Sequence, residues 1–167
     1  MVKQKEKMNI ARVNRISEFE GQTVQLNGWV YNSRRSGKIG FLMLRDGFGI
    51  IQCIVAKNDV GEDKFEEFKK LAQESSLSIV GEVVENDRAP GGYEIIASDL
   101  TIHHLSNDYP ISPKEHGTDF LMNHRHLWLR SKRQHSILKV RHEIIKATRD
   151  FFDSHDFTLV DSPIFTS

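Results

Sequence analysis

One helical pattern interrupts a series of five strand-like patterns in the first two-thirds of the chain. The strand-like patterns are residues 23–33, 41–45, 50–56, 78–85 and 93–105. The helical pattern covers residues 62–75, where four apolar residues recur at spacings of three and four: Phe65, Phe68, Leu71 and Ala72. Asp63 or a neighbour is expected to cap this helix. Its place between the third and fourth strands limits the folds that the chain can adopt.

Three strands, a helix and two strands is the element order of the OB-fold, a small five-stranded Greek-key barrel. An SH3-like barrel or a plain β-sandwich does not require a helix at this place. In the first strand Val24, Leu26 and Val30 share one phase, which we expect to face the core. We therefore predict an all-β OB-fold barrel over residues 11–105, preceded by a basic tail at residues 1–10.

The expected connections between these strands contain glycine. Residues 34–40 are predicted to form a basic loop, and residues 86–92 a long turn. Residues 46–49 are predicted to form a turn that joins the second and third strands into a hairpin.

The character of the sequence changes after the fifth strand. Residues 106–122 hold Pro110, Pro113 and few apolar residues, which predicts a hinge or linker. Residues 134–155 then predict a long helix with a broad apolar face that includes Ile137, Val140, Ile144, Thr148 and Phe151. A face of this width must pack on the rest of a domain, on a second subunit, or on both. We therefore expect residues 123–167 to be the incomplete start of a second domain.

The formal net charge of zero conceals blocks of opposite charge. Residues 1–57 carry 10 Lys and Arg against 4 Asp and Glu, residues 58–122 carry 5 against 14, and residues 123–167 carry 8 against 5. A basic block suggests an anionic partner such as nucleic acid. The alternative is mutual attraction between the basic and acidic segments.

Two neighbouring strands carry the residues that we expect to contact such a partner. Nucleic-acid-binding OB-folds use the outer face of their second and third strands, where aromatic rings stack on bases and basic side chains follow the backbone. Alternation puts Phe41 and Gln52 on that face, so a ring lies beside an amide that can bond a base edge. Arg34, Arg35 and Lys38 cluster in the adjoining loop. The alternatives are that Phe41 closes the barrel mouth and that Gln52 and the loop are merely solvated.

Other kinds of site find no support in the sequence. The eight histidines lack metal-ligand spacing with cysteine or carboxylate partners, so we expect no metal site. No phosphate-binding glycine loop and no nucleophile elbow is present. The lone Cys53 lies in an apolar strand and forms no internal disulfide. No signal-peptide core and no run of about 18 apolar residues appears, which predicts a cytoplasmic protein with no membrane partner.

Several longer stretches carry a family resemblance. They are VQLNGWVYNSRRSGKIGFLMLRDG, GIIQCIV, RAPGGYEI and RHLWLRSKRQ. With these stretches, the chain resembles the aspartyl/asparaginyl branch of class II aminoacyl-tRNA synthetases from about residue 11 to residue 167. The GWV, RDG and Q pattern is common to both kinds of enzyme, whereas APGGYE and RHLWLRS are similar to the asparaginyl version. Residues 157–165 resemble motif 1 of class II synthetases, with Pro163 as its central proline.

The resemblance implies that the OB-fold reads the tRNA anticodon. Phe41 and Gln52 fall on the positions that stack on and bond the middle uracil, and Arg34 falls on a basic contact to the anticodon loop. The turn before the fifth strand is implied to approach the anticodon, although a tight glycine turn needed for backbone geometry accounts for it equally. The residues of that turn are Pro90, Gly91, Gly92 and Tyr93.

The resemblance also implies an assembly and a reaction for the complete enzyme. Motif 1 and the helix before it form the dimer interface in the family, which implicates Ile144, Phe151 and Pro163 in a homodimer. The reaction joins asparagine to tRNA-Asn through asparaginyl-adenylate and uses ATP and Mg²⁺. Motifs 2 and 3 and the amino-acid pocket are absent from these 167 residues. We therefore expect this chain to contain no catalytic residue, to bind no cofactor itself, to bind tRNA weakly and not to aminoacylate.

Other functions stay open at this point. One is a free-standing OB-fold that binds tRNA or other single strands. Others are the N-terminal part of an aspartate-specific or non-discriminating synthetase, and an asparagine-synthetase relative of the family. A pure assembly role through the long helix would leave Phe41, Gln52 and the basic loop unused.

Overall fold

The computed structural model describes residues 9–112 and 114–165. The chain divides into two compact units, one up to Tyr109 and one from Pro110 onward. Most of the expected basic tail, residues 1–8, and Pro113 of the expected hinge lie outside the described residues.

The described part of the first unit holds the strands, two 3-10 helices and two short α-helices. In chain order these are η1 (Val13–Phe19), β1 (Thr23–Ser36), β2 (Ile39–Arg45), β3 (Ile50–Ala56), α1 (Lys57–Val60), α2 (Glu62–Phe68), β4 (Ser76–Glu85), η2 (Pro90–Gly92) and β5 (Tyr93–His104).

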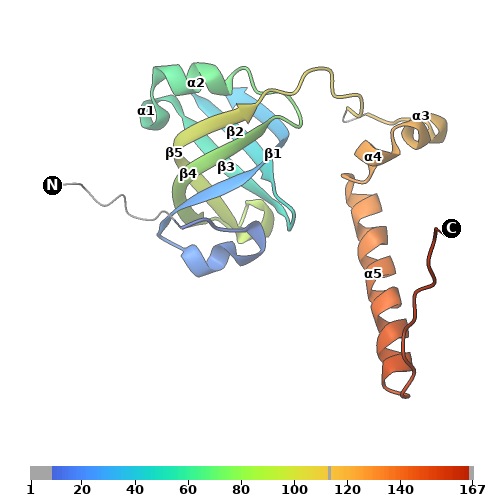
Figure 1. Cartoon of the computed structure of the whole chain (residues 1–167). Coiled ribbons are helices and arrows are strands. Elements are labelled where there is room, and N and C mark those ends of the chain that lie inside the picture. The colour runs from blue at the N-terminus through green and yellow to red at the C-terminus, as the bar shows by residue number, and fades with distance from the viewer. Residues whose placement is uncertain (1–8, 113, 166–167) are drawn as a thin grey trace. The chain divides into compact units, whose positions relative to one another are not determined.

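The five strands close into a barrel in the order β1-β2-β3-β5-β4 (Figure 1). Strands β3 and β5 pair in parallel, and the other four neighbouring pairs are antiparallel. The helices α1 and α2 connect β3 to β4, at the place in the order where the sequence predicts a helix. The predicted OB-fold barrel is therefore confirmed, and its last strand β5 is continuous.

The barrel core is filled by one phase of each strand, as the alternation predicts. The side chains of β1, β2 and β3 that are almost fully buried are Val24, Leu26, Val30, Leu42, Leu44, Ile51, Cys53 and Val55. Burying an aliphatic side chain of this size contributes about 1.5–3 kcal/mol relative to leaving it exposed. The opposite phase of the same strands is thereby turned outward, where it is available to a ligand.

The helix after β3 is shorter than predicted and has a different cap. α2 ends at Phe68, and Ala72 of the expected apolar face is exposed. Gly61 occupies the N-cap position with φ 84° and no side-chain cap bond, so the expected cap at Asp63 is wrong. The helix stops because the following chain hydrogen-bonds to β1 instead: Glu74 N–H donates to the Val30 carbonyl. Glu74 also has a left-handed φ of 67°, which no helix continues.

The connection between β1 and β2 is also shorter than predicted. Arg34 and Arg35 belong to β1, because its ladder with β2 continues to the pair Ser36 and Ile39. Only Gly37 and Lys38 form the turn, and Gly37 has the positive φ of 59° that such a tight reversal needs. The predicted basic loop at residues 34–40 is therefore a strand end, a two-residue turn and a strand start.

The helix η1 packs beside the barrel and has no counterpart among the sequence-based predictions. Its Ile16 is buried in the core cluster. The backbone N–H of Val13 donates to the Asp46 carboxylate at 2.9 Å, which ties η1 to the β2–β3 turn.

The second unit consists of helices α3 (Thr118–Asn123), α4 (Arg125–Trp128) and α5 (Lys132–Asp153) in its described residues. The Ser131 hydroxyl caps α5 by accepting from Gln134 N–H. The long helix predicted at residues 134–155 is therefore present, with its bounds shifted by two residues. Residues 157–165 form neither helix nor strand, so the strand expected there is not observed. No helix in the described ranges is both long and apolar enough to cross a membrane.

Candidate nucleic-acid interface

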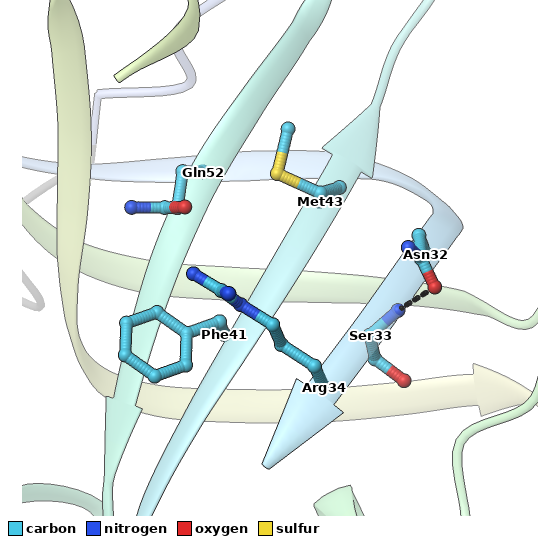
Figure 2. A pocket seen from close by; sticks show the side chains of 6 residues that line it. All are labelled: Asn32, Ser33, Arg34, Phe41, Met43 and Gln52. Atoms are coloured by element: carbon cyan, nitrogen blue, oxygen red, sulfur yellow. Dashed lines mark hydrogen bonds between the residues drawn. The ribbon is translucent and has the colours of Figure 1, made fainter. Parts of the chain in front are cut away.

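A pocket of about 290 Å³ opens on the outer face of β1, β2 and β3. Its lining combines an aromatic ring, a guanidinium, a thioether, two amides and a hydroxyl, as Figure 2 shows. The lining residues are Asn32, Ser33, Arg34, Phe41, Met43 and Gln52. Such a set offers one flat apolar surface and several hydrogen-bonding groups, which is the chemistry that an unstacked base requires.

A β-bulge in β1 determines which side chains reach this pocket. Up to Val30 the even-numbered residues of β1 face the core. The register with β2 then shifts, since Val30 pairs with Leu44 but Asn32 pairs with Met43. The extra residue, Tyr31, reverses the phase. Asn32 and Arg34 therefore face outward beside Met43 and Phe41, although uninterrupted alternation would turn them inward.

Arg34 and Phe41 form the apolar end of the pocket. The two residues are direct partners in the β1–β2 ladder, and the guanidinium carbon lies 4.6 Å from the ring centroid. The Phe41 ring is half-buried on the outer face, beside the guanidinium (Figure 2), and does not close the barrel mouth. A planar cation over an aromatic ring is a favourable contact, and both planes are of a kind on which bases stack.

Gln52 forms the polar end of the pocket, and its amide has a fixed partner. Its Nε2 donates to the Glu94 carboxylate at 3.0 Å. The partner comes from β5, where Glu94 is paired with Gln52 in the parallel β3–β5 ladder. Sequence analysis missed Glu94, because the pairing joins strands that are not consecutive. The alternation within the RAPGGYEI stretch was the available signal, since it turns Glu94 to the face opposite the buried Ile95.

The other two basic candidates do not line the pocket. Arg35 pairs with Gly40 and follows Arg34 directly, so alternation points it to the other face of the sheet. Lys38 is in the two-residue turn, where its carbonyl accepts from Lys57 N–H. Both side chains are exposed, but the structure does not bring them together with Arg34, Phe41 and Gln52.

The candidate turn before β5 also lies outside the pocket lining. Gly91 and Gly92 have φ values of 81° and 79°, which other residues rarely adopt, so backbone geometry accounts for both glycines. The Tyr93 ring packs against the core cluster. Desolvation, followed by the negative charges of Glu20 and Glu85, raises the pKa of the Tyr93 hydroxyl. Pro90 is exposed.

The remaining candidates concern assembly and metals. Ile144 and Phe151 on α5 are 61% and 58% exposed, and Pro163 is exposed as well. Across residues 9–112 and 114–165, no three His, Cys, Asp or Glu side chains gather as a metal site would require. Burial raises the pKa of the Cys53 thiol, and the charge of Glu94 adds to this, so Cys53 is an unreactive core residue.

Two family models match adjacent parts of the chain. Residues 24–102 match the OB-fold nucleic acid binding domain, and residues 117–167 match the tRNA synthetases class II (D, K and N). The resemblance found in the sequence is thereby confirmed for both parts of the chain.

Curated relatives of known function are similar over nearly the whole chain. An asparagine–tRNA ligase of Sorangium cellulosum is 59% identical over 152 residues, which are 90% of this chain and 34% of the relative. One from Symbiobacterium thermophilum is 52% identical over 94% of this chain and 36% of the relative. The chain thus spans about a third of the length of the curated relatives it matches.

Solved structures agree with this relationship. The asparaginyl-tRNA synthetase of Pyrococcus horikoshii, in complex with asparaginyl-adenylate, has a TM-score of 0.86 and 38% identity over 92% of this chain and 36% of that protein. A putative aspartyl-tRNA synthetase of Leishmania major has a TM-score of 0.81 over 98% of this chain and 35% of that protein. It is only 21% identical and shows the shared fold alone.

Proposed function

Because this chain corresponds to the N-terminal portion of the asparagine–tRNA ligases, which are class II aminoacyl-tRNA synthetases, we propose that its OB-fold reads the anticodon of tRNA-Asn. The observation that carries this proposal is the pocket between Phe41 and Gln52. It is open to solvent on the outer face of the barrel and large enough to admit the edge and face of one base.

Each end of the pocket has its own role in this proposal. The Phe41 ring supplies a stacking surface, which is worth about 1–3 kcal/mol per base and is nearly independent of sequence. The Gln52 amide bonds the edge of the same base and supplies the preference for uracil at the middle position. Arg34 lies over Phe41 and adds a positive charge for the neighbouring phosphate.

The whole protein would join asparagine to this tRNA. ATP would activate the amino acid as asparaginyl-adenylate, the compound present in the Pyrococcus horikoshii structure, and Mg²⁺ would offset the charge of the phosphates. The described residues present no cluster of carboxylates or histidines suited to the metal, so we assign neither Mg²⁺ nor ATP to them. Within the proposed enzyme, these 167 residues contribute tRNA recognition, and we expect them not to aminoacylate by themselves.

The second unit would contribute to a homodimer in the whole protein. Its long helix α5 carries exposed apolar side chains along one face, and the segment around Pro163 carries further ones. A second subunit that covers these side chains would remove them from water. Ile144 and Phe151 are the positions at which we place this contact.

Binding of two RNAs tests the anticodon proposal directly. The chain is titrated with tRNA that has a GUU anticodon and with the same tRNA carrying an altered middle base, each at two salt concentrations. We expect tighter binding to the GUU anticodon. Phe41→Ala should weaken binding to both RNAs, because stacking is lost, whereas Gln52→Ala should remove the preference between them. Equal and salt-sensitive binding to both RNAs would mean a general backbone binder and would contradict base reading.

Phe48→Ala provides a matched control for the aromatic variant. Phe48 is also exposed and also lies under an arginine, since the Arg12 guanidinium carbon is 5.0 Å from its ring centroid. It belongs to the β2–β3 turn and does not line the pocket. We expect Phe48→Ala to leave the affinity for both RNAs unchanged. An equal loss in the Phe41 and Phe48 variants would argue against the pocket as the site.

A further inference from the structure

We propose that Glu94 is a positioning residue that locks the Gln52 amide in one orientation and thereby sets which pyrimidine the pocket accepts. This inference rests on the proposed function, because it concerns how the same pocket discriminates between bases. The observation behind it is the hydrogen bond of 3.0 Å from Gln52 Nε2 to Glu94 Oε2.

The chemistry of the partner determines the orientation of the amide. An ionised carboxylate only accepts hydrogen bonds, so the amide group facing it must be the NH₂ and not the carbonyl oxygen. Turning the amide by half a rotation would place two acceptors against each other and would lose a charge-assisted hydrogen bond. Figure 2 shows the two ends of the amide pointing in opposite directions, with the oxygen on the side nearer Met43.

The backbone holds both partners in place for this contact. Gln52 and Glu94 are paired in the β3–β5 ladder, and the residues after them, Cys53 and Ile95, are paired and fully buried. Both side chains therefore leave the sheet on the same outer face from anchored positions. The bond depends on two rigid strands and not on a flexible loop.

Amide orientation matters because uracil and cytosine differ by a matching exchange. Along its pairing edge, uracil presents the N3–H donor followed by the O4 acceptor, whereas cytosine presents the N3 acceptor followed by the N4 amino donor. A base held on Phe41 meets the amide in a fixed position. One orientation of the amide then complements uracil, and the reversed orientation complements cytosine. A freely rotating amide would serve both bases, but a locked amide serves one.

The location of the carboxylate supports a role beyond simple affinity. A negative charge beside the binding site of a polyanion opposes binding. Glu94 is half-buried in the sheet, and its carboxylate reaches the one amide that points into the pocket lining. Its effect on RNA binding is therefore expected in discrimination between bases and not in total affinity.

Anticodon stem–loop RNAs with GUU and GCU anticodons test this inference in the full 167-residue chain. The wild-type chain should prefer GUU by about tenfold, the factor expected for one hydrogen bond gained or lost. Glu94→Gln keeps the size of the side chain, but its amide can either donate or accept, so Gln52 can adopt both orientations. We expect the preference to fall below about threefold, chiefly through tighter binding of the GCU RNA. Glu94→Ala, which leaves Gln52 without this partner, should have the same effect.

Glu67→Gln is the control for the loss of a negative charge. Glu67 is exposed on α2 and is not part of the pocket lining. Its variant should change the affinity for both RNAs equally and leave their ratio unaltered. Thermal unfolding of each variant establishes that the barrel is intact. In the free chain, the side-chain amide NMR signals of Gln52 should show one slowly exchanging proton that Glu94→Ala abolishes.

The outcomes separate this inference from the proposed function. If the wild type prefers GUU and both Glu94 variants retain the full preference, anticodon reading stands and the lock is wrong. If the wild type binds both RNAs equally, base reading by Gln52 and the lock both fail. If the ratio collapses in the Glu94 variants and is kept in Glu67→Gln, the lock is supported.

Discussion

Arg45 of β2 and Glu74 form an ion pair at the edge of the barrel, with 2.7 Å between Nη2 and Oε2. The side chains are only 16% and 4% exposed. Glu74 is also the residue that leaves helical geometry after α2, with its N–H bonded to Val30. The pair therefore fixes the chain reversal that leads from α2 into β4.

Arg45→Met should lower the free energy of unfolding by about 3 kcal/mol, because it leaves the Glu74 carboxylate buried without this partner. The measurement is urea-induced unfolding followed by tryptophan fluorescence in a Trp128→Phe background, so that Trp29 in β1 reports on the barrel alone. Lys57→Met is the control, since it breaks the exposed pair of Lys57 with Glu62 and should cost at most about 1 kcal/mol. Similar losses in the two variants would show that burial of the Arg45 pair has no special effect.

Gly40→Ala should destabilise the barrel by about 1–3 kcal/mol through overpacking. A Cβ atom at this position would lie 2.2 Å from the nearest ring carbon of Phe68, which is itself buried. The same urea titration measures the effect. Gly47→Ala provides the comparison, because nothing lies within 4 Å of its added methyl group and its φ is not positive. An unchanged stability in Gly40→Ala would mean that Phe68 does not pack over β2 as described.

The local patterns in the sequence predicted the barrel well because a strand's alternation decides which face is buried. Phe41 and Gln52 fall on the outer face by this argument alone, and Val24, Leu26 and Val30 fill the core as expected. The end of α2 was not predicted, since the helical spacing continues to Leu71 while the backbone of Glu74 is already bonded to β1.

The parts of the site that were missed depend on relationships between strands. The side on which Arg34 lies is decided by the bulge at Tyr31, which becomes apparent only in the register of β1 against β2. The contact of Glu94 with Gln52 requires the parallel pairing of β3 with β5, which are separated in the sequence by both helices and β4. Neither feature leaves a periodic signal within one segment.

Arg34→Ala should weaken RNA binding and reduce the salt dependence of the binding constant by about one unit of log–log slope, the effect of removing one phosphate contact. Phe41→Ala should weaken binding without changing that slope, because stacking involves no counterion release. Binding titrations at several salt concentrations distinguish the two effects. Arg12→Ala removes the matching arginine over Phe48 and should leave both affinity and slope unchanged. An identical change in slope for Arg12→Ala and Arg34→Ala would indicate diffuse attraction to the basic surface.

Sedimentation velocity should reveal concentration-dependent self-association of the chain through α5. The exposed apolar side chains of this helix include Ile137, Val140, Ile144, Phe151 and Phe152. Ile144→Glu places a charge within that face and should shift the chain toward monomer. Lys146→Glu, two residues further along the helix and therefore on its opposite side, should not. Equal effects of the two substitutions would show that association depends on charge and not on the apolar face.

The stability of the barrel should fall at high pH because of Cys53. Burial, with a further contribution from Glu94, raises the pKa of the Cys53 thiol in the folded chain, whereas the unfolded chain has a thiol pKa of about 8.5. The folded state therefore retains a proton that the unfolded state releases, so the stabilisation is complete below about pH 8.5 and is lost as the pH rises above it. Between pH 7.5 and 9.5, the wild type should lose about 1.4 kcal/mol more free energy of unfolding than Cys53→Ala. The Ala variant is expected to be less stable at both values, because it leaves a small cavity in the core. Parallel pH dependences of the two proteins, measured by urea unfolding with Trp29 as the probe, would contradict a protonated thiol in the folded barrel.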